Sequence, residues 1–170
     1  PGGIRSTAAP FVTGPSAIRP GTIATRTVRL SQVRVDGGDT YWVEQRASQA
    51  GRNVLRRRDG DGQTGGGLPL TPADELVDVR TRVHEYGGRA SAVDSGIIVV
   101  SHAGDGRLYR YDVAPRIRGL VPLTTYGDVR PGDLEIDTGR GLVHALREGH
   151  RGGRQGVNTL VAHSLHGLSR

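Results

Sequence analysis

Short apolar segments of strand length recur along this chain at a nearly constant interval, and this repeat restricts the fold more than any other feature. The segments form three units, namely 39–46, 53–59 and 68–71; 96–102, 107–112 and 121–124; and 141–148 and 158–163. Pro69 of the first unit and Pro122 of the second, each followed by Leu-Thr, lie 53 residues apart. A repeat of roughly 50 residues that carries several strands has the size of one small antiparallel sheet per unit.

The residue types within the repeat favour strands over helices. The segments are rich in Val, Ile, Leu and Tyr, and they alternate or run apolar over strand lengths. Between them lie Asp36–Asp39, Asp59–Gly62 and Gly104–Gly106, whose Gly and Asp residues suit the positive φ angles of hairpin turns. We therefore predict an all-β fold, a partial β-propeller of about three four-stranded antiparallel blades.

The repeat also divides the chain into an arm and a folded part. Residues 1–20, rich in Pro, Gly and Ala, are predicted to form an extended N-terminal arm. Residues 21–170 are predicted to form an incomplete propeller, with blades at about 28–71, 79–124 and 133–170. Closed propellers have roughly 4–8 blades, so this organisation predicts a truncated product with exposed sheet edges.

The stretch Val79–Gly88, with the sequence VRTRVHEYGG, resembles a signature of the N-terminal propeller of bacterial prolyl oligopeptidase-family serine peptidases. The family members concerned are of the acylaminoacyl peptidase and dipeptidyl aminopeptidase type. Other segments resemble neighbouring blades in the same order: Val33–Glu44 and Gly51–Leu55 before the stretch, and Arg107–Arg110 and Val157–Val161 after it. The resemblance extends over roughly residues 16–167.

This resemblance implies a propeller that covers an α/β-hydrolase domain, admits short peptides and excludes folded proteins. The implied partners are therefore short peptides and the catalytic domain with its Ser-Asp-His triad, which this chain lacks. Two departures from the family pattern affect loop contacts rather than the fold. Arg89 stands where a third Gly is usual, and Ser101–Asp105 replaces a more aromatic stretch.

No catalytic residue is predicted in the chain itself. An α/β-hydrolase places its nucleophile in Gly-x-Ser-x-Gly, where a sharp turn exposes the hydroxyl, and no Ser of this chain has Gly at both positions. The segments also lack the alternation of strands and helices that builds a parallel sheet. We therefore predict that the chain alone hydrolyses nothing, and the resemblance to the family implies that it serves as a substrate-gating propeller. The alternative is a stand-alone propeller-like module that binds a protein partner.

Five polar residues are the candidates for contact with substrate or with the catalytic domain. They are Arg80, Arg82, His84, Glu85 and Tyr86, and they are predicted to line the tunnel or the face toward the hydrolase domain. Since adjacent strand residues point to opposite faces, His84 and Glu85 are not expected to act together as base and orienting group. A purely structural alternative is an ion pair between Arg82 and Glu85 beside a turn at 86–88.

No metal or cofactor is predicted. His144 and His150 are six residues apart, and His163 and His166 are three apart without a nearby third ligand, whereas zinc needs three or four converging ligands. Gly65–Gly67 lacks the Lys-Ser/Thr of a phosphate-binding loop. The absence of Cys excludes disulfides and thiolate ligands, and it favours a cytoplasmic location.

Neither a nucleic-acid partner nor a membrane partner is predicted. The net charge of +6 by itself suits phosphate binding. However, the arginines are dispersed, and their single run, Arg56–Arg58, is followed at once by Asp59 and Asp61. Aromatic residues make up only 4% of the chain, which leaves few platforms for base stacking. No stretch approaches the roughly 18 consecutive apolar residues of a membrane span.

Overall fold

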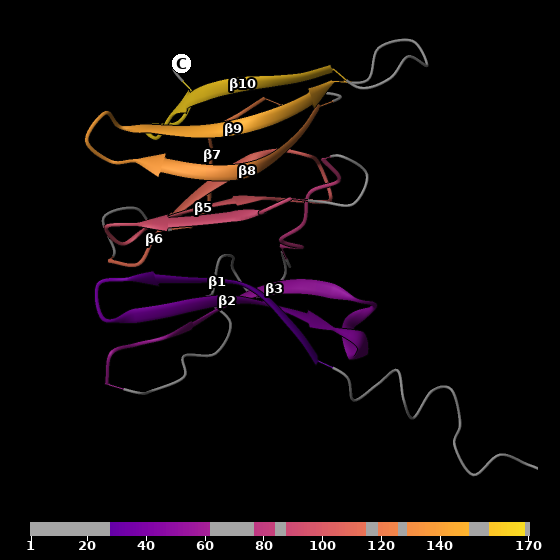
Figure 1. Cartoon of the computed structure of the whole chain (residues 1–170), viewed down its shortest axis with the longest axis vertical. Coiled ribbons are helices and arrows are strands. Elements are labelled where there is room, and N and C mark those ends of the chain that lie inside the picture. The colour runs from indigo at the N-terminus through magenta and orange to yellow at the C-terminus, as the bar shows by residue number, and fades with distance from the viewer. Residues whose placement is uncertain are drawn as a thin grey trace, which may run out of the picture.

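A computed structural model describes residues 28–61, 77–83, 88–114, 119–125, 129–149 and 157–168. Within these ranges the chain forms three antiparallel sheets and one short 3-10 turn, Ala47–Gln49, and no α-helix (Figure 1). The first sheet contains β1 (Val28–Asp36), β2 (Asp39–Arg46) and β3 (Arg52–Arg58). The second contains β4 (Ser91–Asp94), β5 (Ile97–Ser101), β6 (Leu108–Asp112) and β7 (Val121–Pro122). The third contains β8 (Val129–Asp137), β9 (Leu142–Gly149) and β10 (Val157–Ser164).

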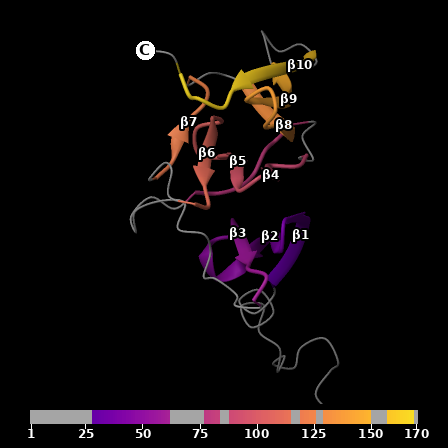
Figure 2. The ribbon, with the colours of Figure 1, turned by 90° about the vertical axis from the view of Figure 1, so that its left-hand side faces the viewer.

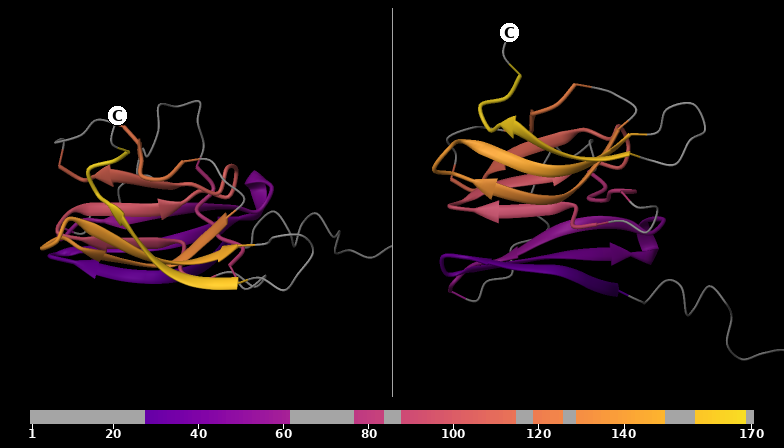
Figure 3. Two further views of the ribbon diagram at one scale, coloured as in Figure 1. Left: turned by 90° about the horizontal axis from the view of Figure 1, so that it is seen from above. Right: turned by 45° about the horizontal axis from the view of Figure 1, so that its top comes forward.

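The three sheets are stacked on one another in chain order, each running from its first strand at one edge to its last strand at the other (Figure 3). The first strands β1, β4 and β8 lie on the same side of the stack, and β4 contacts both β1 and β8 (Figure 2). Antiparallel sheets set side by side in this way are the blades of a propeller.

This arrangement confirms the predicted all-β class and the partial β-propeller. The middle sheet has four strands, and three strands are described in each of the other two. The predicted strand at 68–71 and the predicted arm at 1–20 lie outside the described residues. The limits of the blades stay a prediction.

Two apolar layers hold the three sheets together, and β5 contributes to both. Ile98 and Val100 are fully buried against the first sheet, whereas Val99, on the opposite face of the strand, is buried against the third. A strand covered on both faces needs a continuous apolar run, which explains the sequence Ile-Ile-Val-Val in β5. The other main members of the two layers are Tyr41, Val43, Leu55 and Val79 on one side, and Leu108, Leu134, Val143 and Leu165 on the other.

A β-bulge in each outer sheet directs a polar side chain onto the middle sheet. The bulges lie at Gln32 in β1 and Asp133 in β8, whose φ angles are 55° and 50°. Gln32 Oε1 accepts a hydrogen bond of 2.8 Å from the N–H of Ala90, and Asp133 Oδ1 accepts one of 3.0 Å from the N–H of Arg89. The extra residue of a bulge re-aims a side chain, and here both bulges fix the chain just before β4.

The hairpin turns at the other end of the sheets are joined in the same manner. The Asp36 carboxylate, at the β1–β2 turn, accepts hydrogen bonds from the N–H groups of Ser95 (3.0 Å) and Gly96 (2.7 Å) in the β4–β5 turn. Thr138 Oγ1, after β8, donates a hydrogen bond of 2.7 Å to Asp94 Oδ2. Polar contacts at both ends therefore fix the spacing of neighbouring sheets around the two apolar layers.

Candidate functional site

Two of the five predicted site residues fall within the described part of the chain. Arg80 and Arg82 lie in the extended segment that crosses from the first sheet to the second. His84, Glu85 and Tyr86 lie outside the described residues. The prediction that all five line a tunnel or an interdomain face is therefore not tested by the structure.

The segment that carries Arg80 and Arg82 is fixed by the residues between them. Thr81 and Val83 are buried, with 7% and 0% of their surfaces exposed, so the side chains of the two arginines alternate with them toward the opposite side. A Cβ atom at Gly132 of β8 would lie 2.6 Å from Val83 Cγ1, closer than real contacts allow. Only glycine at this position lets β8 approach the segment, and this contact holds the two arginines in place.

Arg80 and Arg82 line a cavity of about 640 Å³ at the end of the apolar layer between the first and second sheets. Polar residues replace the apolar ones at this end of the layer. The polar lining residues come from β1, β2, β3 and the crossing segment: Arg29, Ser31, Gln32, Gln45, Asn53, Arg80, Thr81 and Arg82. Arg29, which the sequence analysis missed, thus joins the two predicted arginines.

The cavity wall contains three guanidinium groups, and none of its lining residues is Asp or Glu. Arg80 Nη2 donates a hydrogen bond of 2.8 Å to the carbonyl oxygen of Gly51, and its Nε lies 3.9 Å from Asp78 Oδ2. Neither Arg29 nor Arg82 forms an ion pair with any residue that the structure describes. The predicted alternative, an ion pair between Arg82 and Glu85, cannot be placed within the described residues. On this evidence the cavity carries an excess of positive charge.

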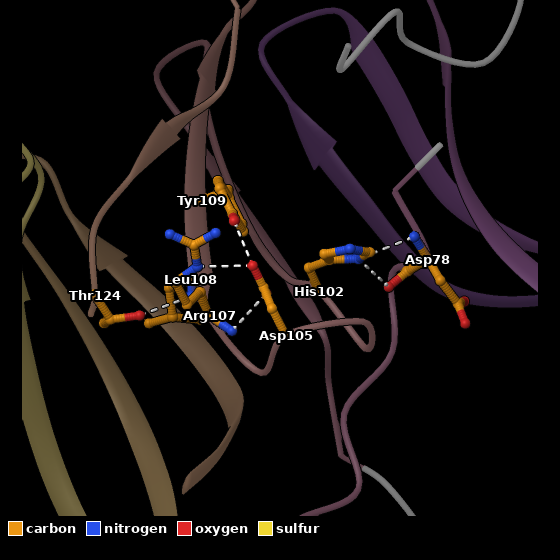
Figure 4. Close-up of polar contacts among 7 residues, drawn as sticks. All are labelled: Asp78, His102, Asp105, Arg107, Leu108, Tyr109 and Thr124. Carbon is orange, nitrogen blue, oxygen red and sulfur yellow. Dashed lines mark hydrogen bonds and ion pairs between the residues drawn. The ribbon is translucent and has the colours of Figure 1, made fainter. Parts of the chain in front are cut away.

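A second polar cluster lies in the β5–β6 turn and is drawn in Figure 4. Asp105 accepts hydrogen bonds from the Tyr109 hydroxyl (2.5 Å), from Arg107 Nε (2.7 Å) and from the Arg107 N–H (3.0 Å). The Arg107 guanidinium also lies 5.1 Å from the centre of the Tyr109 ring, a cation–π contact. In this way Asp105 closes the turn in the Ser101–Asp105 stretch that departs from the family pattern.

The cluster does not assemble a nucleophile, a base and an orienting acid. His102 Nδ1 accepts a hydrogen bond of 3.2 Å from the Asp78 N–H, and Figure 4 shows its ring turned toward Asp78 and away from Asp105. The Thr124 hydroxyl accepts a hydrogen bond of 3.0 Å from the Leu108 N–H. These polar groups hold loops onto strands, so the cluster is a structural network.

The stability of the Asp105 network should depend on acid pH. Burial raises the pKa of the Asp105 carboxyl, but the hydrogen bonds from Tyr109 and Arg107 outweigh burial and hold the pKa below its ordinary value of 3.8. The carboxylate therefore stabilises the fold fully above that value, and its contribution is lost as the pH falls through the lower folded-state pKa. Asp105→Asn should remove this part of the acid dependence of the free energy of unfolding, measured by urea denaturation at several pH values. It should also cost about 1–3 kcal/mol at neutral pH.

Tyr109→Phe tests the same network by removing a hydrogen-bond donor to Asp105 instead of the carboxylate. The variant removes one donor to Asp105 and leaves the carboxyl in place, so its acid dependence should lie between those of the original chain and Asp105→Asn. Identical acid dependence in all three chains would contradict the assignment.

The described residues offer no site for a metal ion. Within the ranges that the structure covers, no three His, Asp or Glu residues come together. Of the histidines weighed in the sequence, His150 lies outside these ranges, and His163 lies on β10 with its pKa lowered by burial and by Arg147. No helix in the described part of the chain has the length and apolar character needed to cross a membrane.

Three solved structures are similar to this chain over nearly its whole length. The crystal structure of puromycin hydrolase is 30% identical with a TM-score of 0.76, and the match covers 95% of this chain and 25% of that one. A puromycin hydrolase mutant complexed with PGG is 31% identical with a TM-score of 0.74, covering 93% and 25%. A Mycobacterium tuberculosis puromycin-hydrolyzing peptidase is 29% identical with a TM-score of 0.73, covering 94% and 25%. No protein-family model and no curated protein matches the chain.

The structural matches confirm the resemblance predicted from the sequence. The neighbours are peptidases of the prolyl oligopeptidase family, and this chain has the architecture of a partial propeller. The chain spans about a quarter of the length of each neighbour.

Proposed function

We propose that this chain, a partial β-propeller similar to part of the prolyl oligopeptidase-family peptidases, is the non-catalytic, substrate-gating segment of such a peptidase. Its partners would be an α/β-hydrolase catalytic domain and short peptides, either free or blocked at the N-terminus, as in the dipeptidyl and acylaminoacyl types. The observation that carries the proposal is the match to puromycin hydrolase over 95% of the chain at 30% identity.

Two features of the chain support a role without bond cleavage. The sequence contains no Gly-x-Ser-x-Gly nucleophile motif. The two bulge contacts and the Asp105 network are hydrogen bonds that join loops and blades, and they assemble no reactive group. A rigid stack of blades can admit a small substrate along one side while it excludes a folded protein by size, and this requires no reactive group in the propeller.

A chimera tests the proposal directly. The matching quarter of puromycin hydrolase is replaced by this chain, and the product is assayed for labelling by a fluorophosphonate probe and for hydrolysis of puromycin. Because the fold of the two segments is the same, the chimera should retain labelling and hydrolysis, and it should leave a folded protein substrate intact. The isolated chain should show neither labelling nor hydrolysis.

The control is puromycin hydrolase from which the same quarter has been deleted without replacement. It should lose activity or lose the exclusion of folded proteins. Labelling of a serine in the isolated chain would show that the chain is itself catalytic. A chimera no more active or selective than the deletion would overturn the gating role.

A stand-alone interaction module remains the second candidate, and exposed apolar side chains on the two outer sheets favour it. Val33 and Val35 of β1 are 60% and 70% exposed, and Leu160 of β10 is 72% exposed. Exposed apolar surface of this kind marks contact with another protein surface. The module hypothesis predicts an inactive chimera together with a saturable protein partner for the isolated chain, which separates it from the gating role.

A further inference from the structure

The cavity at the end of the first apolar layer has a wall chemistry that the gating role by itself does not require. Arg29 lies on β1, two residues before Ser31 and therefore on the same face of the strand. Its partner across β1 and β2 is Gln45, and all three residues line the cavity. Arg80 and Arg82 line the same cavity from the crossing segment. A space of about 640 Å³ between them is within the range of small-ligand sites, roughly 300–1,000 Å³.

Only one of the three guanidiniums of this wall has an acidic partner among the described residues: Arg80 pairs with Asp78, whereas Arg29 and Arg82 have no such partner. Asp78 Oδ1 accepts a hydrogen bond of 2.9 Å from the Asn53 N–H, and its Oδ2 is 3.9 Å from Arg80 Nε, beyond hydrogen-bond distance. Asp78 therefore holds β3 and offsets part of the charge of Arg80 but does not line the cavity, so the wall keeps the charges of Arg29 and Arg82. The bond from Arg80 to the Gly51 carbonyl fixes one guanidinium at the wall before any ligand arrives.

Arg130 contacts the backbone of the crossing segment at Arg82. Its Nη1 lies 3.4 Å from the carbonyl oxygen of Arg82, a contact that orients the backbone of Arg82 while the Arg82 side chain stays exposed. Guanidinium groups present a planar fork of N–H donors that matches a carboxylate. Clustered guanidiniums with no acid among the lining residues are the arrangement that an anionic ligand stabilises.

We propose that this cavity binds the carboxylate of a short peptide, with Arg29, Arg80 and Arg82 as the groups that recognise it. The amides of Gln45 and Asn53, which also line the cavity, are placed to hydrogen-bond the peptide backbone beside the carboxylate. The inference rests on the proposed function, because it takes short peptides as the ligands. It adds a selectivity for a free C-terminal carboxylate over an uncharged end.

Calorimetric titration of the full chain with acetyl-trialanine tests the inference. The peptide with a free carboxylate should bind. Its C-terminal amide should bind at least roughly tenfold more weakly, because it lacks the charge-assisted hydrogen bonds. Arg82→Gln should weaken binding of the carboxylate form by a similar factor and leave binding of the amide unchanged. Arg29→Gln, a second exposed position, should act in the same direction.

Arg147→Gln is the matched control, since Arg147 is exposed on β9, does not line the cavity and changes the net charge equally. It should leave binding of the carboxylate form within about twofold of the original chain. Equal binding of the acid and the amide, equal losses in Arg82→Gln and Arg147→Gln, or no binding by a chain that is folded by circular dichroism would each overturn the inference.

The inference and the proposed function fail in different experiments. An active, size-selective chimera that treats acid and amide peptides alike while Arg29, Arg80 and Arg82 are all intact would retain the gating role and remove the carboxylate site. A chain that binds the acid selectively while the chimera is inactive would retain the site and remove the gating role.

Discussion

Arg110→Ala should destabilise the chain by about 3–5 kcal/mol, because it breaks a buried ion pair from one side. Arg110 Nε and Nη2 lie 2.7 Å and 2.9 Å from the two carboxylate oxygens of Asp112, and the side chains are only 11% and 4% exposed. Arg110 Nη1 also donates a hydrogen bond of 2.7 Å to the carbonyl oxygen of Leu165, which ties the second sheet to the third. Urea denaturation followed by circular dichroism measures the loss.

Arg140→Ala is the matched control. Arg140 Nη1 lies 2.7 Å from Asp137 Oδ2, as close as the buried pair, but the Arg140 side chain is 77% exposed. Since exposed ion pairs contribute little, this variant should leave the free energy of unfolding nearly unchanged. The double variant Arg110→Met with Asp112→Leu should recover most of the loss, because it removes the stranded carboxylate as well. Equal effects of Arg110→Ala and Arg140→Ala would contradict this account of the pair.

Leu134→Ala should cost about 2–5 kcal/mol through the cavity it leaves between the second and third sheets. Leu134 lies on β8 and is fully buried among Val99, Leu108 and Val143. Because the residues around it belong to two sheets, closing the space would require the sheets to move together, which the polar contacts at both ends of the sheets oppose. The shift of the urea midpoint at constant slope measures the effect.

Leu160→Ala is the matched control, since it truncates an exposed leucine of the same sheet. Leu160 lies on β10 and is 72% exposed, so its truncation should alter the free energy of unfolding by less than about 0.5 kcal/mol. Similar losses for Leu134→Ala and Leu160→Ala would mean that the third sheet is not packed on the second as described.

Leu134→Ala also bears on the candidate site, because Leu134 shares its strand with a residue that contacts the crossing segment. β8 carries Leu134, and it also carries Gly132, which packs on Val83 in the segment that holds Arg80 and Arg82. A third sheet that is loosened at Leu134 would release that segment and widen the cavity. Leu134→Ala should therefore weaken peptide binding as well as stability, whereas Leu160→Ala should affect neither.

The strands in the middle of each sheet could be predicted from the sequence. The predicted segments 39–46, 96–102 and 141–148 correspond to β2, β5 and β9. These strands are paired on both sides, and their apolar residues face a buried layer, so burial alone imposes a regular pattern on them.

The first strand of each sheet was not among the predicted strand segments. For β1 and β8 the bulges explain why. In β1 the apolar residues fall at positions 28, 30, 33 and 35, and the bulge at Gln32 shifts the alternation by one residue. In β8 the Pro131-Gly132 pair resembles a turn, although tertiary contact with Val83 is what requires that glycine. A local pattern cannot distinguish a turn glycine from one that allows close approach.

Two of the cavity-lining residues, Arg80 and Arg82, are among the five predicted site residues, because the stretch that contains them resembles the family signature. Their predicted place in a tunnel or at an interdomain face stays a prediction. Arg29 had no signal of its own, because it joins the other two only through the pairing of β1 with β2 and the stacking of two sheets.

The amino-acid sequence by itself determined the all-β class, the repeat and the absence of a Gly-x-Ser-x-Gly motif, because strand periodicity, turn residues and a short motif are local properties. Only the tertiary structure decided which side chains meet between sheets. The bulge contacts to Ala90 and Arg89, the ion pair that reaches Leu165, and the three guanidiniums around one cavity join residues far apart in the chain. Such contacts depend on register and on the distance between sheets, and neither is encoded in any single segment.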